Sequence, residues 1–126
     1  MASVKRINVV FLYVLDLAKE RKFFEAAFDL GKPVVDAKWW VEYAVGDGSH
    51  LALHQLDAQH AQRAGLGAGA VKFSIEVDDI QAYTEKLKKL NVTFRYEPRK
   101  EYGFWLAEFE DPEGNPLRLY QKIAKP

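Results

Sequence analysis

The feature that most constrains the fold of this chain is an order of predicted elements, strand-helix-strand-strand-strand, that occurs twice. The strand-to-helix corner at Asp16 returns at Asp79, 63 residues later (79 − 16). The segment LALHQ at 51–55 matches LRLYQ at 117–121 at an offset of 66 (117 − 51). A repeat of this length that occurs only twice favours two similar modules over a solenoid, whose repeats are shorter. We therefore expect an α+β fold of two tandem βαβββ modules.

The local patterns set the expected bounds of these elements. Short runs rich in β-branched and aromatic residues, bounded by Gly, Pro, Asn and Asp, are typical of strands. Asp16 is a predicted helix N-cap, and the first helix is expected to end near Leu30 and Gly31, where glycine can take the left-handed C-cap conformation. The expected strands are 9–15, 33–36, 38–45, 50–56, 71–77, 92–97, 104–110 and 117–122, and the second helix is 79–90.

The length of 126 residues indicates one domain, which can bury about two-thirds of its unfolded surface without a metal or disulfide. We expect module 1 at about 5–57, a linker at about 58–69 and module 2 at about 70–123. The linker overlaps GLGAGA at 65–70, which fits a loose dinucleotide-binding pattern but precedes a strand, so no helix N-terminus faces a phosphate. The two sheets are expected to curve into an incompletely closed barrel around a cavity, with one helix per module outside.

Composition removes several classes of function. The absence of cysteine excludes thiolate zinc sites, iron–sulfur clusters, a cysteine nucleophile and disulfides. Eighteen basic against 18 acidic residues leave no positive surplus for nucleic acid. The apolar run at 7–15 is too short to span a bilayer, so we expect no membrane partner and a cytoplasmic protein.

Strand alternation predicts which side chains face the cavity. A helix-covered face must be apolar, so the intervening positions point to the other face. In 39–43 and 104–109 both sets of alternate residues are half apolar, so the pattern does not decide which side chains face the cavity. Aromatic residues, 13% of the chain and bunched at 39–43 and 102–105, suit a pocket wall and suit a plain core equally well. The positions expected to face the cavity are Val9, Phe11, Tyr13, Ala52, His54, Lys72, Ser74, Glu76, Arg118 and Tyr120.

Three motifs carry a family resemblance. FEDPEGNPLRL at 109–119 resembles an Asp-Pro-x-Gly-Asn turn followed by an apolar-x-Leu strand. LYVLDL at 12–17 and FSIEVDDI at 73–80 are similar to strand-to-helix signatures of the same family. Together they resemble the glyoxalase, bleomycin-resistance and extradiol-dioxygenase superfamily, the vicinal oxygen chelate fold, whose unit is a tandem βαβββ module. The resemblance covers essentially the whole chain.

The resemblance also bears on metal binding. Metal-dependent members place His, Gln or Glu at one cavity-facing position on each of four strands, and the matching positions here are Val9, Ala52, Lys72 and Arg118. None of these side chains is an ordinary ligand for a divalent cation. The chain therefore resembles the metal-free branch, which includes binding proteins that sequester antibiotics such as bleomycin in a groove between subunits. This implies a homodimer that binds a small molecule without a cofactor.

The expected ligand is planar or apolar. Lys72 and Arg118 favour a carboxylate, phosphate, phenolate or quinone-like oxygen, and the neutral net charge disfavours cationic bleomycin itself. Glu76 either contacts the ligand or pairs with one of these cations. The alternatives are a metal-free isomerase or cyclase with Glu76 or His54 as general base, and a metal enzyme using His50 and His54 with Glu42 or Glu76. The expected ligand-binding residues are Phe11, Tyr13, Trp39, Trp40, His54, Lys72, Ser74, Glu76, Trp105, Arg118 and Tyr120.

Overall fold

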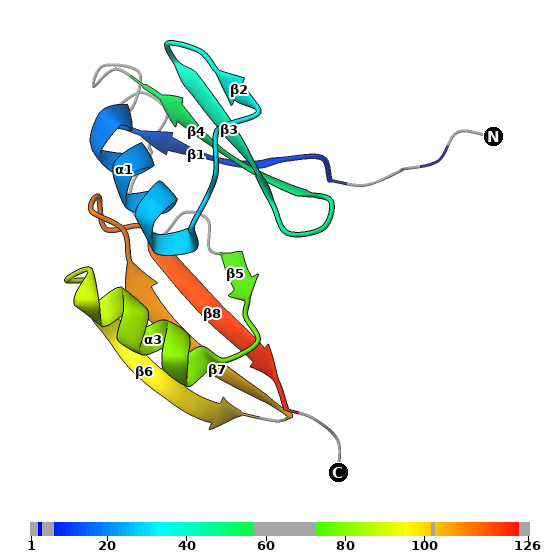
Figure 1. Cartoon of the computed structure of the whole chain (residues 1–126), viewed down its shortest axis with the longest axis vertical. Coiled ribbons are helices and arrows are strands. Elements are labelled where there is room, and N and C mark those ends of the chain that lie inside the picture. Colours follow the sequence, from blue (N-terminus) through cyan, green and yellow to red (C-terminus); the bar gives the residue numbers. More distant parts are fainter. Residues whose placement is uncertain (1–2, 4–6, 57–72, 102, 124–126) are drawn as a thin grey trace. The chain divides into compact units, whose positions relative to one another are not determined.

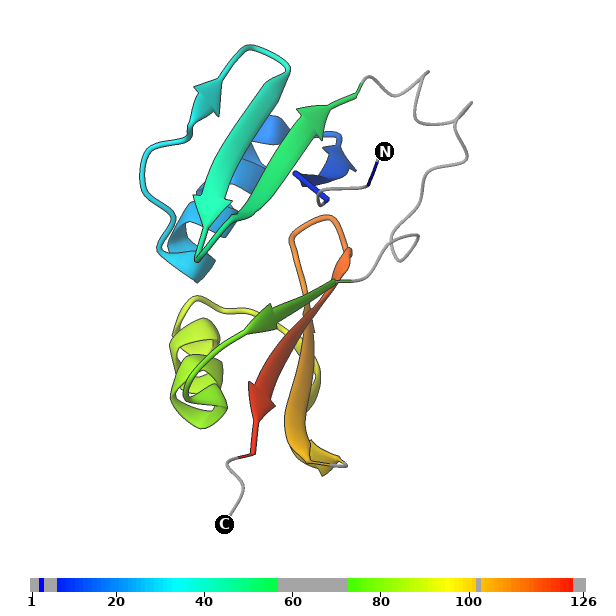
Figure 2. The ribbon, with the colours of Figure 1, turned by 90° about the vertical axis from the view of Figure 1, so that its right-hand side faces the viewer.

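The computed structural model describes residues 3, 7–56, 73–101 and 103–123 of the chain. The chain divides into two compact units, Met1–Gly65 and Leu66–Pro126. In the described residues each unit consists of a four-stranded mixed sheet and one helix (Figures 1 and 2). The prediction of a two-module α+β fold is confirmed. Neither sheet closes on itself, and an enclosing barrel with a cavity stays a prediction, as does the single-domain organisation with its module bounds.

The first unit has the predicted order of elements. Its sheet is arranged β1-β4-β3-β2, in which β1 pairs with β4 in parallel and the other neighbours are antiparallel. The parallel pair follows from the helical crossover between β1 and the rest of the sheet. The elements are β1 (Val10–Val14), α1 (Leu17–Phe28), β2 (Val35–Asp36), β3 (Trp40–Val45) and β4 (Ser49–Gln55).

The second unit repeats this arrangement. Its sheet is ordered β5-β8-β7-β6, with β5 parallel to β8 and the other pairs antiparallel. Figure 1 shows α3 lying along one face of this sheet. The elements are β5 (Phe73–Glu76), α3 (Ile80–Lys89), β6 (Phe94–Glu101), β7 (Phe104–Glu110) and β8 (Pro116–Lys122).

Each unit has its core between the helix and one sheet face. Strand alternation predicts that Val10, Leu12 and Val14 of β1 pack inward; Leu12 and Val14 are buried, and Val10 is half-buried. Phe24 of α1 is also fully buried, and burial of a side chain of this size stabilises the fold by about 1.5–3 kcal/mol. The other buried apolar residues are Ala27, Val41, Tyr43, Leu51 and Leu53 in the first unit, and Ile80, Leu87, Leu106, Ala107, Phe109, Leu117 and Leu119 in the second.

The helix N-caps lie where the sequence predicts them. Asp16 Oδ1 accepts a hydrogen bond from the backbone N–H of Lys19 at 3.1 Å, and Asp79 Oδ1 accepts one from Ala82 at 3.0 Å. Each bond satisfies a backbone donor that has no partner inside the helix. The predicted C-terminus of the first helix is wrong: α1 ends at Phe28, and Asp29 takes the left-handed conformation at φ 51°. Aspartate tolerates this region better than most residues, so glycine is not required there.

A glutamine at the end of each unit's last strand holds the start of its helix. Gln55 Oε1 accepts a hydrogen bond from the backbone N–H of Leu17 at 2.8 Å. Gln121 Oε1 accepts one from Ile80 at 2.7 Å. These two residues are aligned by the 66-residue offset, so the repeat preserves a contact between strand and helix as well as the order of elements.

The turn between β7 and β8 is built around one buried carboxylate. Asp111 Oδ1 accepts hydrogen bonds from the backbone N–H groups of Glu113 at 3.0 Å and Asn115 at 2.8 Å, and its Oδ2 accepts from Asn115 Nδ2 at 2.8 Å. Gly114 has φ 84°, a region in which other residues are strained. The DPEGN motif is thus a turn stabilised by its own side chains, and it sets the register of β8 against β7.

Strand β6 is longer than predicted. It continues to Glu101, whereas the sequence analysis ends this strand at 97. Pro98 lies inside β6, which is an edge strand and pairs with β7 through two irregularities. The missing N–H of proline is tolerated on an edge or at a bulge, so the strand continues past it.

Candidate ligand-binding site

Four ring-bearing side chains gather on the face of the first sheet that points away from α1. Phe11 and Tyr13 alternate with the buried Leu12 and Val14 on β1, and they are 39% and 42% exposed. In register, Tyr13 of β1 and Trp40 of β3 both lie opposite His54 of the central strand β4. Side chains opposite one another in register share a face. The predicted residues Phe11, Tyr13, Trp40 and His54 are therefore brought together, and we call this group the aromatic surface.

The rings of the aromatic surface contact one another at several angles. The ring centroid of His54 lies 5.3 Å from that of Tyr13, 5.7 Å from that of Trp40 and 6.3 Å from that of Phe11. Phe11 lies 5.4 Å from Tyr13 and 5.0 Å from Trp40. Tilted and edge-to-face contacts at these separations are the favoured geometries of aromatic pairs. The group presents a contiguous, partly exposed apolar surface, which suits contact with a flat ligand.

A small residue lies beneath these rings. Ala52 lies opposite Phe11 and Glu42 in register on either side and is fully buried. Its position matches one of the family's metal-ligand positions, where a longer polar side chain would occupy the space that the rings fill. The methyl group leaves that space to Phe11 and its neighbours.

Glu42 fixes the orientation of the Trp40 indole. Trp40 Nε1 donates a hydrogen bond to Glu42 Oε1 at 3.0 Å, and His50 Nδ1 lies 2.6 Å from Glu42 Oε2. Because a carboxylate only accepts, His50 Nδ1 carries the proton. The hydrogen bond from His50, assisted by that from Trp40, lowers the pKa of Glu42 below its ordinary value. The carboxylate is therefore ionised at neutral pH and holds both donors in place.

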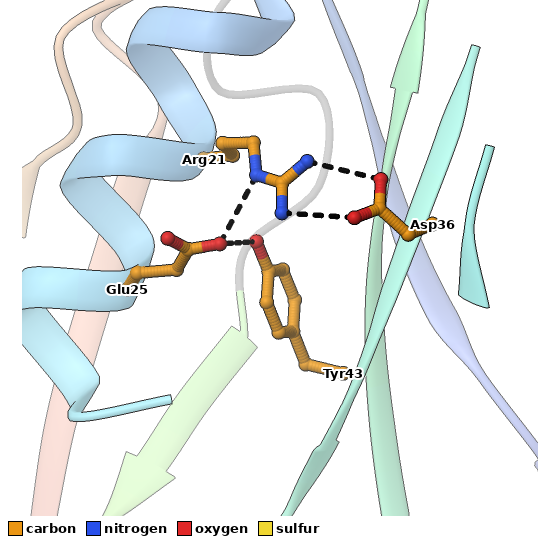
Figure 3. Close-up of polar contacts among 4 residues, drawn as sticks. All are labelled: Arg21, Glu25, Asp36 and Tyr43. Atoms are coloured by element: carbon orange, nitrogen blue, oxygen red, sulfur yellow. Dashed lines mark hydrogen bonds and ion pairs between the residues drawn. The ribbon is translucent and has the colours of Figure 1, made fainter. Parts of the chain in front are cut away.

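On the opposite face of the same sheet, a polar network fixes β2 and β3 to α1 (Figure 3). The Tyr43 hydroxyl donates to Glu25 Oε2 at 2.5 Å, and the Arg21 guanidinium donates to Glu25 at 3.1 Å and to Asp36 at 3.1 and 3.4 Å. Burial of the Tyr43 ring and its bond to Glu25 raise the pKa of the phenol. Since Trp40 and Tyr43 belong to one strand, this network steadies the strand that carries part of the aromatic surface.

One predicted residue near the aromatic surface stays outside it. Trp39 precedes β3 and is exposed, and the ammonium group of Lys38 lies 4.9 Å from the centroid of its ring. It makes no ring contact with the four residues of the aromatic surface.

The remaining predicted residues belong to the second unit. Ser74 and Arg118 lie opposite each other in register, as do Glu76 and Tyr120, so these four share the sheet face that points away from α3. This agrees with the predicted alternation. The ring of Phe104 lies 5.5 Å from that of Tyr120. Lys72, the other predicted cation of this face, lies outside the described residues.

Arg118 lies beside an acidic group that the sequence analysis did not place. Glu108 is opposite Arg118 in register and is buried, and it pairs with Arg95 Nη1 at 3.2 Å. Arg95 also donates to Glu110 at 2.8 Å. Arg118 Nε is buried without a hydrogen-bond partner in the described structure. Glu76 is exposed and forms no ion pair with Arg118 within the described residues.

Trp105 is not brought together with Arg118 and Tyr120. It lies opposite Gln121 in register, and Gln121 contacts the first turn of α3. Strand alternation therefore places Trp105 on the α3 side of the sheet with Ala107 and Phe109. The sequence pattern left this face open because both alternations of 104–109 contain apolar residues.

The donor set does not fit the metal of the family's metal-dependent members. Val9 and Ala52 have hydrocarbon side chains, and Arg118 is a cation. Among the residues that the structure describes, no three His, Cys, Asp or Glu side chains form a group that could hold a metal ion. Glu42 and His50 contact each other, and His54 Nδ1 lies against the backbone carbonyl of Gln55 at 2.8 Å. The predicted alternative of a metal on His50 and His54 with Glu42 or Glu76 has no support in the geometry of the described residues.

The sequence and the fold are those of a known class of proteins. The model of the Glyoxalase/Bleomycin resistance protein/Dioxygenase superfamily matches residues 6–119. The chain belongs to this superfamily. No helix in the described part of the chain is long and apolar enough to cross a membrane.

Solved structures of the superfamily share the fold at low sequence identity. A glyoxalase/bleomycin resistance protein/dioxygenase family enzyme from Burkholderia phytofirmans PsJN is 17% identical with a TM-score of 0.79, over 92% of this chain and 98% of that one. Lactoylglutathione lyase from Agrobacterium tumefaciens is 21% identical with a TM-score of 0.76, over 95% and 96%. TnmS3, an antibiotic binding protein from Streptomyces sp. CB03234, is 21% identical with a TM-score of 0.76, over 97% and 99%. No protein of curated function matches the sequence significantly.

Proposed function

We propose that this protein binds a planar, largely apolar small molecule on the aromatic surface and does so without a metal ion. The observation that carries the proposal is the contiguous group of Phe11, Tyr13, Trp40 and His54 on one sheet face, with two of its rings about two-fifths exposed. A soluble domain gains stability by burying such rings, so leaving them together at a surface favours a binding role.

The lack of a fitting metal-donor set favours binding over metal-dependent catalysis. Three of the four family positions, Val9, Ala52 and Arg118, offer no ordinary metal ligand in the described structure, and Lys72 at the fourth is a cation by sequence. We propose an antibiotic-like ligand, which agrees with the description of TnmS3 as an antibiotic binding protein. From the sequence we also propose that Arg118 and Lys72 attract an anionic or quinone-like oxygen of a ligand. We also propose that the protein acts as a homodimer.

Binding constants for a defined planar probe test this function. We expect 2-methoxynaphthalene to bind the wild-type protein, and we expect Phe11→Val and Tyr13→Val to weaken binding by about tenfold each, since loss of one ring contact costs roughly 1–2 kcal/mol. Valine keeps the strand propensity of β1 while removing the ring. The matched control is Leu90→Ala, which removes an apolar side chain that is 42% exposed at the end of α3.

The proposal fails if Leu90→Ala weakens binding as much as the two β1 variants do, or if neither 2-methoxynaphthalene nor its hydroxyl analogue 2-naphthol binds. Native mass spectrometry of the protein as purified adds an independent check of subunit number and of any retained small molecule. A dimer that carries an organic adduct is the expected spectrum, and one metal ion per subunit would contradict the metal-free proposal.

A further inference from the structure

His54 occupies the centre of the aromatic surface. It is on the central strand β4, with Tyr13 on one side and Trp40 on the other in register. Rings of Phe11, Tyr13 and Trp40 all lie within 6.3 Å of its own ring, measured between centroids. A flat ligand that covers this surface therefore lies against the imidazole.

The backbone fixes the tautomer of this imidazole. His54 Nδ1 lies 2.8 Å from the carbonyl oxygen of Gln55. A carbonyl oxygen only accepts, so the Nδ1 atom of His54 carries the proton and donates it. In the neutral ring, Nε2 is then a lone-pair acceptor.

The carbonyl that sets the tautomer is itself held in place. The Gln55 side chain accepts from Leu17 N at 2.8 Å and donates to the backbone oxygens of Leu15 at 2.8 Å and Leu56 at 3.0 Å. The Gln55 backbone N–H donates to Trp39 O at 2.9 Å. These contacts anchor the end of β4, so the direction of the His54 ring is fixed before a ligand arrives.

The Nε2 atom of His54 has no partner among the residues that the structure describes. Within the described residues it makes no hydrogen bond, and it is not among the buried polar atoms, so a ligand or solvent can reach it. The other strong acceptor on this face, the Glu42 carboxylate, already accepts from Trp40 and His50. Besides the Tyr13 hydroxyl, which can donate as well as accept, His54 Nε2 is therefore an acceptor on this surface that cannot donate in the neutral ring and whose direction is fixed.

We infer that His54 Nε2 determines specificity by accepting a hydrogen bond from the ligand, so that the protein selects planar aromatic ligands that carry a hydroxyl group, such as phenols. This inference rests on the proposed function and names the ligand class of the same site. An unpaired nitrogen at a desolvated surface costs free energy unless the ligand supplies a donor, which is why a ligand without one is disfavoured.

The test uses a matched pair of probes, 2-naphthol and 2-methoxynaphthalene, which share a ring system but differ in a donor hydroxyl. For the wild-type protein we expect 2-naphthol to bind about 3- to 10-fold more tightly, the range for one neutral hydrogen bond. In His54→Phe, which keeps a ring and removes the acceptor, we expect the ratio of the two dissociation constants to fall to about one. In the control Leu90→Ala the wild-type ratio should be retained.

A second measurement on the wild-type protein does not depend on the folding of a variant. Long-range ¹H–¹⁵N correlation spectra of the histidine rings should show His54 protonated at Nδ1, with the Nε2 resonance shifting on addition of 2-naphthol and not of 2-methoxynaphthalene. Equal affinities of the two probes for the wild-type protein, or a ring protonated at Nε2, would overturn the inference while leaving the proposed function intact. Failure of both probes to bind would overturn the proposed function and the inference together.

Discussion

Replacing Glu42 by glutamine should destabilise the protein in a way that depends on pH. The Glu42 carboxylate accepts hydrogen bonds from Trp40 Nε1 at 3.0 Å and from His50 Nδ1 at 2.6 Å, and its side chain is 17% exposed. Glutamine has one acceptor oxygen, and its amide nitrogen only donates. In Glu42→Gln at least one of the two donors therefore loses its partner.

The magnitude follows from the kinds of bond involved. A hydrogen bond to a charged group contributes about 1.5–3 kcal/mol and a neutral one about 0.5–1.5 kcal/mol. The variant loses two bonds of the first kind and keeps one of the second kind, or two where the His50 ring changes tautomer and accepts from the glutamine amide. Because the His50 side chain is 35% exposed, solvent compensates part of that loss. We expect the free energy of unfolding to fall by about 2 kcal/mol near neutral pH.

The direction of the pH dependence follows from the lowered pKa of Glu42. The hydrogen bond from His50, with that from Trp40, holds this pKa below the ordinary value of 4.5 in the folded protein. A group whose pKa is lower in the folded state stabilises that state above its unfolded pKa, and the contribution is lost as pH falls through the folded value. The difference between the wild-type protein and Glu42→Gln should therefore be largest at neutral pH and should shrink in acid.

Urea unfolding followed by circular dichroism, near neutral pH and at about pH 3.5, measures this difference. The matched control is Glu97→Gln, which removes the carboxylate of an exposed ion pair with Lys88 and should cost at most about 0.5 kcal/mol. A loss below about 0.5 kcal/mol for Glu42→Gln at neutral pH, or a loss of equal size at both pH values, would refute the reasoning.

Two further predictions concern the contacts that support the aromatic surface. Tyr43→Phe should lower the free energy of unfolding by about 1–2 kcal/mol, because it removes the hydrogen bond from a buried side chain to Glu25. The control Tyr96→Phe removes a hydroxyl that has no partner in the described structure, so it should change the free energy of unfolding by less than about 0.5 kcal/mol. Equal effects of the two variants in thermal unfolding would contradict this prediction. Gln55→Ala should lower the free energy of unfolding by about 2–3 kcal/mol and Gln121→Ala by about 1 kcal/mol. Among the described residues, the Gln55 side chain makes three hydrogen bonds and the Gln121 side chain makes one. A larger loss for Gln121→Ala than for Gln55→Ala in urea unfolding would argue against the role assigned to these glutamines.

Much of the fold is predictable from the sequence because its determinants are local or repeated. The N-caps Asp16 and Asp79 each act within one helical turn, and both are confirmed. The matching glutamines at 55 and 121 reveal the duplication, and the structure gives each the same contact with a helix start. The alternation on β1 is clear because Leu12 and Val14 are strictly apolar, which leaves Phe11 and Tyr13 on the other face.

The features that the sequence analysis missed depend on register between strands. The contact of Glu42 with His50 requires β3 and β4 to pair so that 44 lies opposite 50 and 42 opposite 52, which no local pattern sets. The alternation of His50 and His54 on one strand did group both with Glu42 in the sequence, but as an alternative metal site and not as a hydrogen-bonded pair of Glu42 and His50. Glu108 was missed for the same reason, because apolar residues occupy both alternations of β7 and only its pairing with β8 shows which face Glu108 lies on.

Chemical-shift mapping of a bound planar probe tests the central claim most directly. In ¹H–¹⁵N spectra of the wild-type protein titrated with 2-naphthol, we expect the largest shifts at the backbone amides of Phe11, Tyr13 and His54 and at the indole N–H of Trp40. Amides of the Arg21, Glu25 and Tyr43 network, on the other face of the same sheet, should move much less. Shifts centred on that network or confined to α3 would contradict the assignment of the aromatic surface as the ligand-binding site.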